Sequence, residues 1–361
     1  MKKWPLFLGL MLVVMLAAIS CNKEGNEPAP IAQLDRKPML ENYANNFIAP
    51  AYAKMTTDVE ALESAVSAFV AAPDEAKLIA AQQALATAYL QWQKTDLYEF
   101  GPAEGAQLRS YMNTYPVTVS KVTDNISSGT YDLESFGNRD AQGFPAMDYL
   151  LNGTDMSMYT TGANAAGRKA YLSAVVAKMA EKIKAVNTDW STYKSTFIES
   201  TGTDVNSSLS QVVNGCVLYY ERYLRGGKIG IPAGVMSGTP SVGHVESFYS
   251  PENSIPFAVA ALNEVKNFYT GGTAASMQTY LAAIGTKDDN GMLMADLIQQ
   301  EMTEAINSMK GLNGTLIDNI NNNRTSVLQA YDEIQDVVPL LKVDMVSAFS
   351  ISITYTDNDG D

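Results

Sequence analysis

The chain has 361 residues and a formal net charge of −14, with 46% hydrophobic and 18% charged residues. This composition is that of a folded globular protein and excludes a disordered or low-complexity chain. The acidic balance disfavours the phosphates of nucleic acids and anionic lipid surfaces, so no nucleic-acid partner is expected. The length suits two domains of roughly 150 residues each.

The N-terminus has the features of an export signal. Residues 1–3 are basic and residues 4–18 form an apolar stretch that is too short for a stable membrane span. The string LAAISC, which ends at Cys21, resembles a bacterial lipobox. We therefore expect a lipoprotein signal peptide over residues 1–20, a lipid anchor on Cys21 and a flexible tether over residues 21–33. No Asp follows Cys21, which favours the outer membrane, on its periplasmic or surface side. The alternative is a plain signal peptide with an incidental Cys.

Cysteine usage excludes a disulfide framework. Cys21 and Cys216 are the only two cysteines, and an acylated Cys21 leaves Cys216 without a partner. Cys216 lies in the apolar string VVNGCVL, which favours a buried, inert thiol over a reactive one.

Helical periodicity dominates the first half of the chain. It predicts a long helix over residues 34–72, kinked or split at Pro50, and a second helix from about residue 74 to residue 98. Residues 103–142 are rich in Asn, Ser and Gly, with a short helical piece near residues 117–126, as in a functional or docking insertion. A short helix at residues 143–151 and an amphipathic helix over residues 163–188 follow.

The second half repeats this helical character. A helix over residues 204–225 is expected to end at Gly226-Gly227, before a turn-rich loop at residues 228–234 and a Ser-, Gly- and Pro-rich stretch at residues 235–255. The remaining expected elements are helices at residues 256–270, 274–284, 291–311 and 315–349, and a short strand or extended tail at residues 350–355.

Two halves with about four long helices each predict an all-α protein made of two four-helix-type bundles in tandem. The expected N-terminal bundle spans residues 34–202, and the expected C-terminal bundle spans residues 203–361 with a short extended tail.

The short helix that begins at Gly143 carries a motif. Phe144, Met147, Leu150 and Leu151 recur at helical spacing, so one face of the helix is apolar and expected to be buried. Pro145 stands in the first turn, where the missing N–H has no intrahelical partner to lose. The one ionisable side chain on this helix is Asp148.

This string resembles the signature of imelysin-like proteins, which is G-x-H-x-x-E followed by an apolar run. Gly143 matches, Pro145 stands in place of the His, and Asp148 stands in place of the Glu. Trp92 upstream of Gly101-Pro102, and Lys228 before a Pro-Gly turn, match the family as well. The resemblance covers residues from about 40 to 355.

The resemblance implies two helical bundles with the signature helix facing a groove between them. It also implies a role in iron uptake and a peptidase activity that rests on the His and Glu of the signature. Such a pair at i and i+3 suits two ligands of one metal ion. Pro145 has no side-chain donor atom and Asp148 is shorter than Glu, so peptidase activity is not expected from this site. Asp148 is either an acidic ligand in the groove or a buried acid satisfied by backbone donors or an Arg.

Two further groups of residues are candidates for a site. His244, the one His in the chain, and Glu246 could join Asp148 around a metal ion, although a lone loop His is commonly a surface residue. Charged residues flank the two turns that the family shares, and they could line a groove of mixed charge or form salt bridges between the halves. They are Asp96, Glu99, Glu104, Glu221, Arg222 and Lys228.

The preferred hypothesis from the sequence is a binding component of the cell envelope, without peptidase activity, that takes part in iron or other metal or cofactor uptake. Its cofactor would be iron or another divalent or trivalent cation, and its partner an iron-uptake or other envelope protein. One alternative is a metal-dependent peptidase with a site rearranged around Asp148, His244 and Glu246. The other is a docking module that contacts an envelope protein through residues 103–142.

Overall fold

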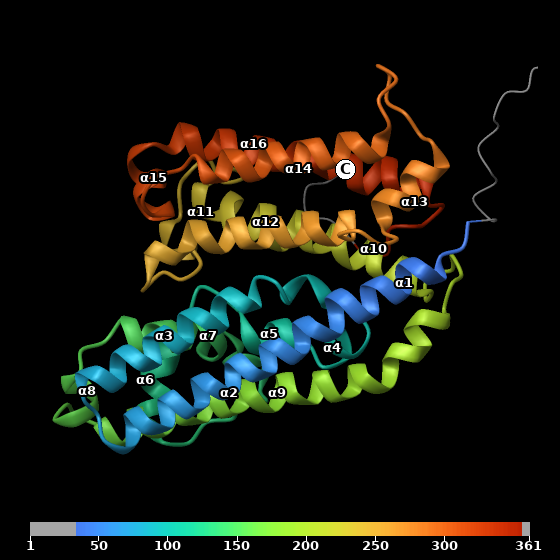
Figure 1. Ribbon diagram of the computed structural model, residues 1–361. Coiled ribbons are helices and arrows are strands. Elements are labelled where there is room, and N and C mark those ends of the chain that lie inside the picture. Colours follow the sequence, from blue (N-terminus) through green and yellow to red (C-terminus); the bar gives the residue numbers. More distant parts are fainter. Residues whose placement is uncertain (1–33, 356–361) are drawn as a thin grey trace, which may run out of the picture.

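The computed structural model describes residues 34–355, so the predicted signal peptide, Cys21 and the tether lie outside the described residues. The chain forms two layers of helices, with the N-terminal half in one layer and the C-terminal half in the other (Figure 1). Within residues 34–355 the regular structure is helical, apart from one isolated bridge between Lys287 and Leu293. The predicted all-α class is confirmed.

The N-terminal layer is built around one long helix, formed by α1, η2 and α2 in succession. Helices α3 and α9 pack against its α2 part. The motif helix α7 packs against both α3 and α9, so both of these helices hold the motif in place. The principal elements are α1 (Lys37–Asn42), η2 (Tyr43–Ile48), α2 (Ala49–Ala71), α3 (Glu75–Trp92), α7 (Gly143–Asn152) and α9 (Ala165–Glu199).

Pro50 does not split the first helix, which runs without a break from α1 through η2 to α2. The segment η2 is a π-helix, and the N–H of Ala49 bonds to the carbonyl of Ala44, five residues earlier. This wider turn relieves the clash that a Pro ring makes with the carbonyl of the preceding α-helical turn.

The stretch between α3 and α7 consists of short helices. The expected helical piece near residues 117–126 is α6, which ends at the left-handed Gly129. These short helices are η3 (Asp96–Tyr98), α4 (Pro102–Gly105), α5 (Leu108–Met112), α6 (Val119–Ser128) and η4 (Phe136–Ala141). One more short helix, α8 (Ser157–Thr160), lies between α7 and α9.

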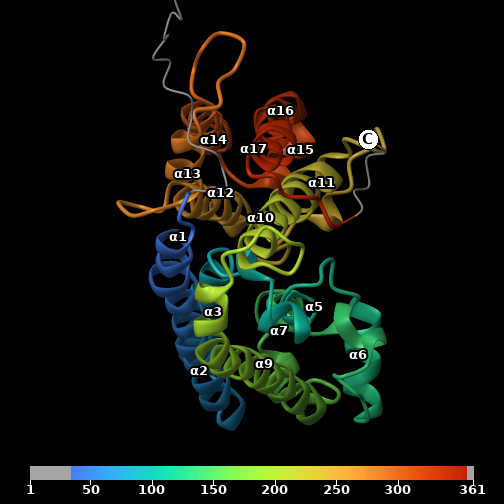
Figure 2. The ribbon, with the colours of Figure 1, turned by 90° about the vertical axis from the view of Figure 1, so that its right-hand side faces the viewer.

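In the C-terminal layer, α14 packs against α12 and α16, and η5 packs against α16 and α12 (Figure 2). Its helices are α10 (Ser208–Leu218), η5 (Tyr219–Gly230), α11 (Ile231–Ala233), η6 (Val242–His244), η7 (Pro251–Asn253), α12 (Ser254–Thr270), α13 (Met277–Ile284), α14 (Met294–Lys310), α15 (Leu316–Asn322), α16 (Arg324–Pro339), η8 (Leu340–Met345) and α17 (Val346–Ala348).

The expected helix end at Gly226-Gly227 is wrong, because η5 continues through both glycines to Gly230. A Gly inside a helix costs only about 1 kcal/mol, which tertiary packing can offset. Here the packing is close: a Cβ on Gly230 would lie 2.9 Å from the ring of Tyr331. Lys228, expected in a loop, is therefore a helical residue.

The C-terminus also differs from the expectation of one helix over residues 315–349. Asn323 leaves the helical conformation with φ −145° and separates α15 from α16. Residues 351–355 form no strand. Instead, the side chain of Asn214 on α10 donates to the carbonyl of Ser352 at 3.1 Å and accepts from the N–H of Thr354 at 2.8 Å, which ties the tail to that helix.

The two layers are joined by buried contacts. The rings of Tyr43 and Phe268 stack with centroids 4.1 Å apart, and the N–H of Met277 donates to the hydroxyl of Tyr43 at 2.7 Å. The hydroxyl of Tyr98 donates to Glu264 at 2.5 Å. The halves therefore share one packed interface, and the cavities between them are confined to parts of it.

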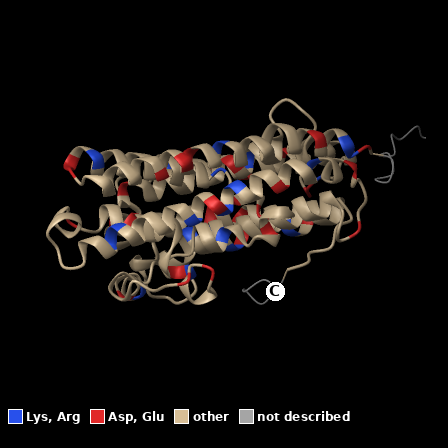
Figure 3. Ribbon diagram, turned by 90° about the horizontal axis from the view of Figure 1, so that it is seen from below, with Lys and Arg blue, Asp and Glu red and all other residues tan. Residues whose placement is uncertain are grey.

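Acidic and basic residues are interspersed along the helices on the face seen in Figure 3. None of the helices within residues 34–355 is long and apolar enough to cross a membrane.

Candidate functional site

The motif helix α7 runs from Gly143 to Asn152, one residue beyond its expected end, and its apolar face is buried, as predicted. Gly143 has φ +72°, and a Cβ at this position would lie 2.4 Å from the carbonyl oxygen of Met112. No other residue fits such a backbone without strain. Gly143 thus fixes how closely α7 approaches the C-terminal end of α5.

Asp148 is 1% exposed, and each of its carboxylate oxygens is used. Oδ2 accepts from the backbone N–H of Tyr249 at 2.8 Å, and Oδ1 accepts from Ser250 Oγ at 2.6 Å and Asn152 Nδ2 at 2.9 Å. Burial raises the pKa of Asp148, while these three hydrogen bonds oppose the rise. Asp148 is therefore a buried acid that neutral donors hold, and two of them come from the C-terminal half.

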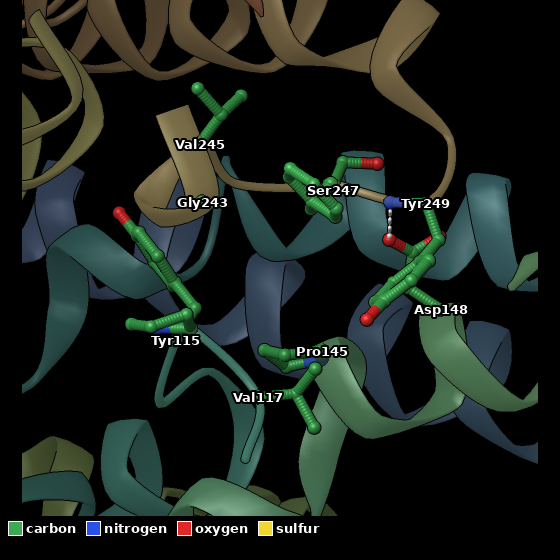
Figure 4. A pocket seen from close by; sticks show the side chains of 10 residues that line it. Tyr115, Val117, Pro145, Asp148, Gly243, Val245, Ser247 and Tyr249 are labelled. Atoms are coloured by element: carbon green, nitrogen blue, oxygen red, sulfur yellow. Dashed lines mark hydrogen bonds between the residues drawn. The ribbon is translucent and has the colours of Figure 1, made fainter. Parts of the chain in front are cut away.

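A small cavity of about 200 Å³ lies beside the motif helix, between it and the segment at residues 243–249 (Figure 4). Pro145 and Asp148 line it from α7, Tyr115 from the N-terminal half, and Val245 and Tyr249 from the C-terminal half. The position that the family signature gives to His therefore faces a cavity at the joint of the two halves, but Pro145 presents no donor atom there.

A buried ion pair of the C-terminal half is tied to the N-terminal half by two side-chain amides. Lys228 Nζ lies 2.6 Å from Glu246 Oε2, and both side chains are 3% exposed. Lys228 also donates to Gln93 Oε1 at 2.6 Å, and the amide of Gln93 donates to Glu246 Oε1 at 3.0 Å. Asn113 donates to the same oxygen at 2.7 Å and accepts from the Tyr89 hydroxyl, also at 2.7 Å. Every charge in this network has partners, which is the condition under which a buried pair is tolerated.

A larger groove of about 650 Å³ lies next to this network, and Asn113 belongs to both. One wall comes from the N-terminal half, including the insertion at residues 103–142, and the other comes from α10, η5, α11 and η6. Its lining residues are Glu99, Glu104, Gln107, Arg109, Ser110, Asn113, Thr114, Tyr115, Phe136, Leu218, Arg222, Tyr223, Gly227, Ile231 and His244. The volume falls within the range of roughly 300–1,000 Å³ typical of small-molecule sites.

Arg109 is held firmly at the base of this groove. Its Nε donates to Asp96 Oδ1 and its Nη2 to the Asp96 carbonyl at 2.6 Å, while its guanidinium carbon lies 3.9 Å from the centre of the Tyr223 ring. Burial lowers the pKa of Arg109, but the nearby carboxylates of Asp96 and Glu99 outweigh it and hold the pKa above its usual value. The cation is therefore permanent.

Glu99 is a titratable acid of the groove. Both of its oxygens accept from the backbone N–H of Arg109, at 3.0 and 3.1 Å. Burial raises the pKa of Glu99 to about 7, against the opposing effect of Arg109. Near neutral pH this carboxyl is thus divided between its charged and neutral forms.

Of the residues that the sequence nominated for the groove, only some line it. Glu99, Glu104 and Arg222 do, whereas Asp96 is 3% exposed beneath Arg109. Glu221 is buried and holds Lys342 at 3.1 Å. For Asp96, Glu221 and Lys228, salt bridges are therefore the better description.

The other nominated residues are structural. Trp92 is fully buried and its ring packs near Phe144 of the motif helix. Gly101 has φ +57° with Tyr193 against it, and Pro102 begins α4. Cys216 is buried, and burial raises the pKa of its thiol to about 12, so its setting is that of the inert thiol expected.

The predicted grouping of Asp148, His244 and Glu246 around one metal ion is not found. His244 lines the larger groove, where its Nδ1 lies 2.7 Å from Ser241 Oγ, while the two acids are engaged with Tyr249 and Lys228. Among the residues that the structure describes, no three His, Cys, Asp or Glu side chains could hold a metal ion together. The motif helix does not fit a zinc ion, because Pro145 has no donor atom and the carboxylate of Asp148 already accepts three hydrogen bonds.

The sequence alone did not point to Arg109, Gln93 or Asn113. No local pattern marks them, because their partners are distant in sequence: Gln93 and Lys228 are 135 positions apart.

Two stacked helical layers, joined by a packed interface with a motif helix and a groove at the joint, define the class of imelysin-like folds. The profile of the imelysin family matches residues 48–340, so the chain belongs to the imelysin family.

Relatives and solved structures agree with this assignment. Over 78 residues the chain is 30% identical to iron-regulated protein A of Synechococcus elongatus, a match that spans 22% of this chain and 22% of that protein. The structure of a candidate iron-regulated protein A precursor from Parabacteroides distasonis superimposes with a TM-score of 0.71 at 20% identity, covering 87% of this chain and 94% of that one. An imelysin-like protein from Psychrobacter arcticum gives 0.70 at 18% identity, covering 89% and 97%. These two likenesses show the fold.

Proposed function

We propose that this protein is a binding component of the cell envelope, anchored by a lipid on Cys21, that takes part in iron or other metal or cofactor uptake and does not cleave peptides. The observation that carries the proposal is the contrast between the two hollows at the joint. In the motif cavity, Pro145 has no donor atom for a metal ion, and both carboxylate oxygens of Asp148 are engaged in hydrogen bonds. The larger groove instead presents charged and aromatic side chains in a volume of about 650 Å³.

The names of the similar proteins support the link to iron. The Synechococcus relative and the Parabacteroides structure both carry the name iron-regulated protein A. The signal peptide predicted at residues 1–20 supports an envelope location, with an envelope uptake protein as the expected partner. The acidic charge of the chain is compatible with metal cations in that compartment.

A block of the groove tests the binding role. Ser110 lines the groove, and its hydroxyl bonds only to the backbone of its own turn, so Ser110→Trp fills the groove without breaking a long-range contact. Ser191 on the exposed side of α9 makes the same kind of bond, so Ser191→Trp is a matched control. Under iron limitation, we expect the host strain with Ser110→Trp to grow like the deletion strain and the strain with Ser191→Trp to grow like wild type. Equal growth of the two variant strains would contradict a role for the groove.

A second experiment tests the absence of cleavage. The purified mature protein is incubated with an unfolded protein substrate in the presence and absence of zinc, and digestion is followed by mass spectrometry. We expect an intact substrate. Digestion that requires zinc and stops with a chelator would instead support the rearranged peptidase.

The lipid anchor is tested through Cys21. Labelled fatty acid is expected on the wild-type protein and not on Cys21→Ser, and the variant is expected in the soluble fraction. Labelling of Cys21→Ser would contradict attachment at this residue.

A further inference from the structure

We propose that the larger groove binds a small organic carboxylate, either free or as a metal chelate, through the guanidinium of Arg109. This inference rests on the proposed function in that it takes the groove as the binding site. It adds the chemical class of the ligand and the residue that recognises it.

The geometry of Arg109 suits the binding of a carboxylate. Asp96 holds two nitrogens of the guanidinium, Nε and Nη2, and the ring of Tyr223 supports its face. The third nitrogen, Nη1, makes no hydrogen bond within residues 34–355, and Arg109 lines the groove. A planar cation held on one edge and one face presents its remaining edge to a ligand. Carboxylates are the natural partners of such an edge, because their two oxygens match the spacing of N–H donors on a guanidinium.

The charges that surround Arg109 also suit an anionic ligand. The titratable groups that face the groove are Glu99, Glu104, Tyr115, Arg222, Tyr223 and His244, with Asp96 buried below. Glu104 is exposed to solvent, which screens its charge. Arg222 adds a second cation from the opposite wall. Glu99 becomes a neutral hydrogen-bond donor when it is protonated, so the base of the groove then favours an anion.

The mouth of the groove is apolar. Phe136 from η4 is 83% exposed and Ile231 from α11 is 50% exposed, and both line the groove. They come from opposite halves and present apolar surface above the polar base. A ligand with carboxylates and a carbon skeleton fits this arrangement better than a bare ion does, because a bare ion leaves the apolar mouth unused.

The pH dependence follows from Glu99. Its pKa is about 7, so lowering the pH through this range removes a negative charge next to the bound carboxylate. Affinity for the carboxylate is therefore expected to rise as the pH falls from 8 to 6. Glu99→Gln keeps an oxygen for the N–H of Arg109 but has no charge to lose, so this variant should bind at pH 8 more tightly than wild type and with a weaker dependence on pH.

The test is calorimetric titration of the purified mature protein with citrate and, separately, with ferric citrate. We expect at least one to bind, with Arg109→Lys weaker by about tenfold or more, because Lys keeps the charge but loses the planar edge. Binding of citrate alone would identify the free acid as the ligand, and binding of ferric citrate only would identify the chelate. Circular dichroism and thermal unfolding show whether Arg109→Lys is folded, and Glu99→Gln tests the same site through its pH profile if it is not.

The proposal is overturned if neither compound binds, or if Arg109→Lys and Glu99→Gln bind like wild type at every pH. This failure differs from failure of the proposed function. If Ser110→Trp abolishes growth under iron limitation while carboxylates do not bind, the groove is functional and the ligand class is wrong. If Ser110→Trp grows like wild type, the groove itself is not the binding site.

Discussion

Two buried acids tie residues 243–250 to the N-terminal half, and they do so in different ways. Glu246 is paired with the cation of Lys228 inside a network of amides, whereas Asp148 receives three hydrogen bonds from neutral donors and forms no ion pair within residues 34–355. The family motif marks Asp148, yet the network with two opposite charges at the joint is built around Glu246. The most recognisable residue in the sequence is thus not the one on which the joint depends most.

The largest effect is expected from breaking the ion pair. Lys228→Met leaves Glu246 buried without a cation, and loss of one partner from a buried pair costs roughly 3–5 kcal/mol. Urea unfolding of the purified protein measures this loss. The double variant Lys228→Met with Glu246→Gln removes both charges and should recover a large part of it. A single variant within about 1 kcal/mol of wild type would show that the pair contributes little to stability.

The next largest loss of stability is expected at Gly143, where α7 packs closely against the end of α5. Gly143→Ala places a Cβ 2.4 Å from the carbonyl of Met112 at φ +72°, so strain and clash together are expected to cost about 3 kcal/mol. Gly129→Ala is the matched control, because Gly129 has φ +66° but open space around its Cβ position. It should cost about 1 kcal/mol. Equal costs for the two variants would show that the close packing of α7 adds nothing.

At Asp148, the size of the effect should depend on the replacement. Asp148→Ala leaves the N–H of Tyr249 and the hydroxyl of Ser250 without their acceptor, at a cost of about 2 kcal/mol. Asp148→Asn keeps an acceptor oxygen and removes a desolvated charge, so it should cost less than about 1 kcal/mol. If Asn were as costly as Ala, the negative charge of Asp148 would have to be stabilising, and the contrast with Glu246 would disappear.

The smallest effect is the pH dependence of stability. Burial raises the pKa of Asp148 above the usual 3.8, so its contribution to stability is complete below pH 3.8 and is lost as the pH rises through the raised pKa. Asp148→Asn cannot lose this contribution. The difference in unfolding free energy between wild type and Asp148→Asn should therefore shift in favour of the variant as the pH rises above 3.8, as urea titrations at a series of pH values would show. A shift in favour of wild type would mean that the charged form is the preferred one.

The fold could be predicted from the sequence where local signals decide it. The motif helix begins at Gly143 because a left-handed Gly and a first-turn Pro mark its start, and the all-α class follows from periodicity along the chain. Local signals were misleading at Gly226 and Gly227, where the π-helix η5 persists because the C-terminal half packs around it. They were silent on the amides that surround the ion pair, because Glu246 meets Asn113 across 133 positions. Long-range partners of this kind follow only from the packing of the two halves.

The most direct test of the account is iron uptake by iron-starved cells of the host, measured side by side for Asp148→Asn and Ser110→Trp. A binding role of the groove, with a purely structural role at Asp148, predicts near wild-type uptake with Asp148→Asn and uptake at the level of the deletion strain with Ser110→Trp. The reverse result, with uptake lost in Asp148→Asn and retained in Ser110→Trp, would contradict it.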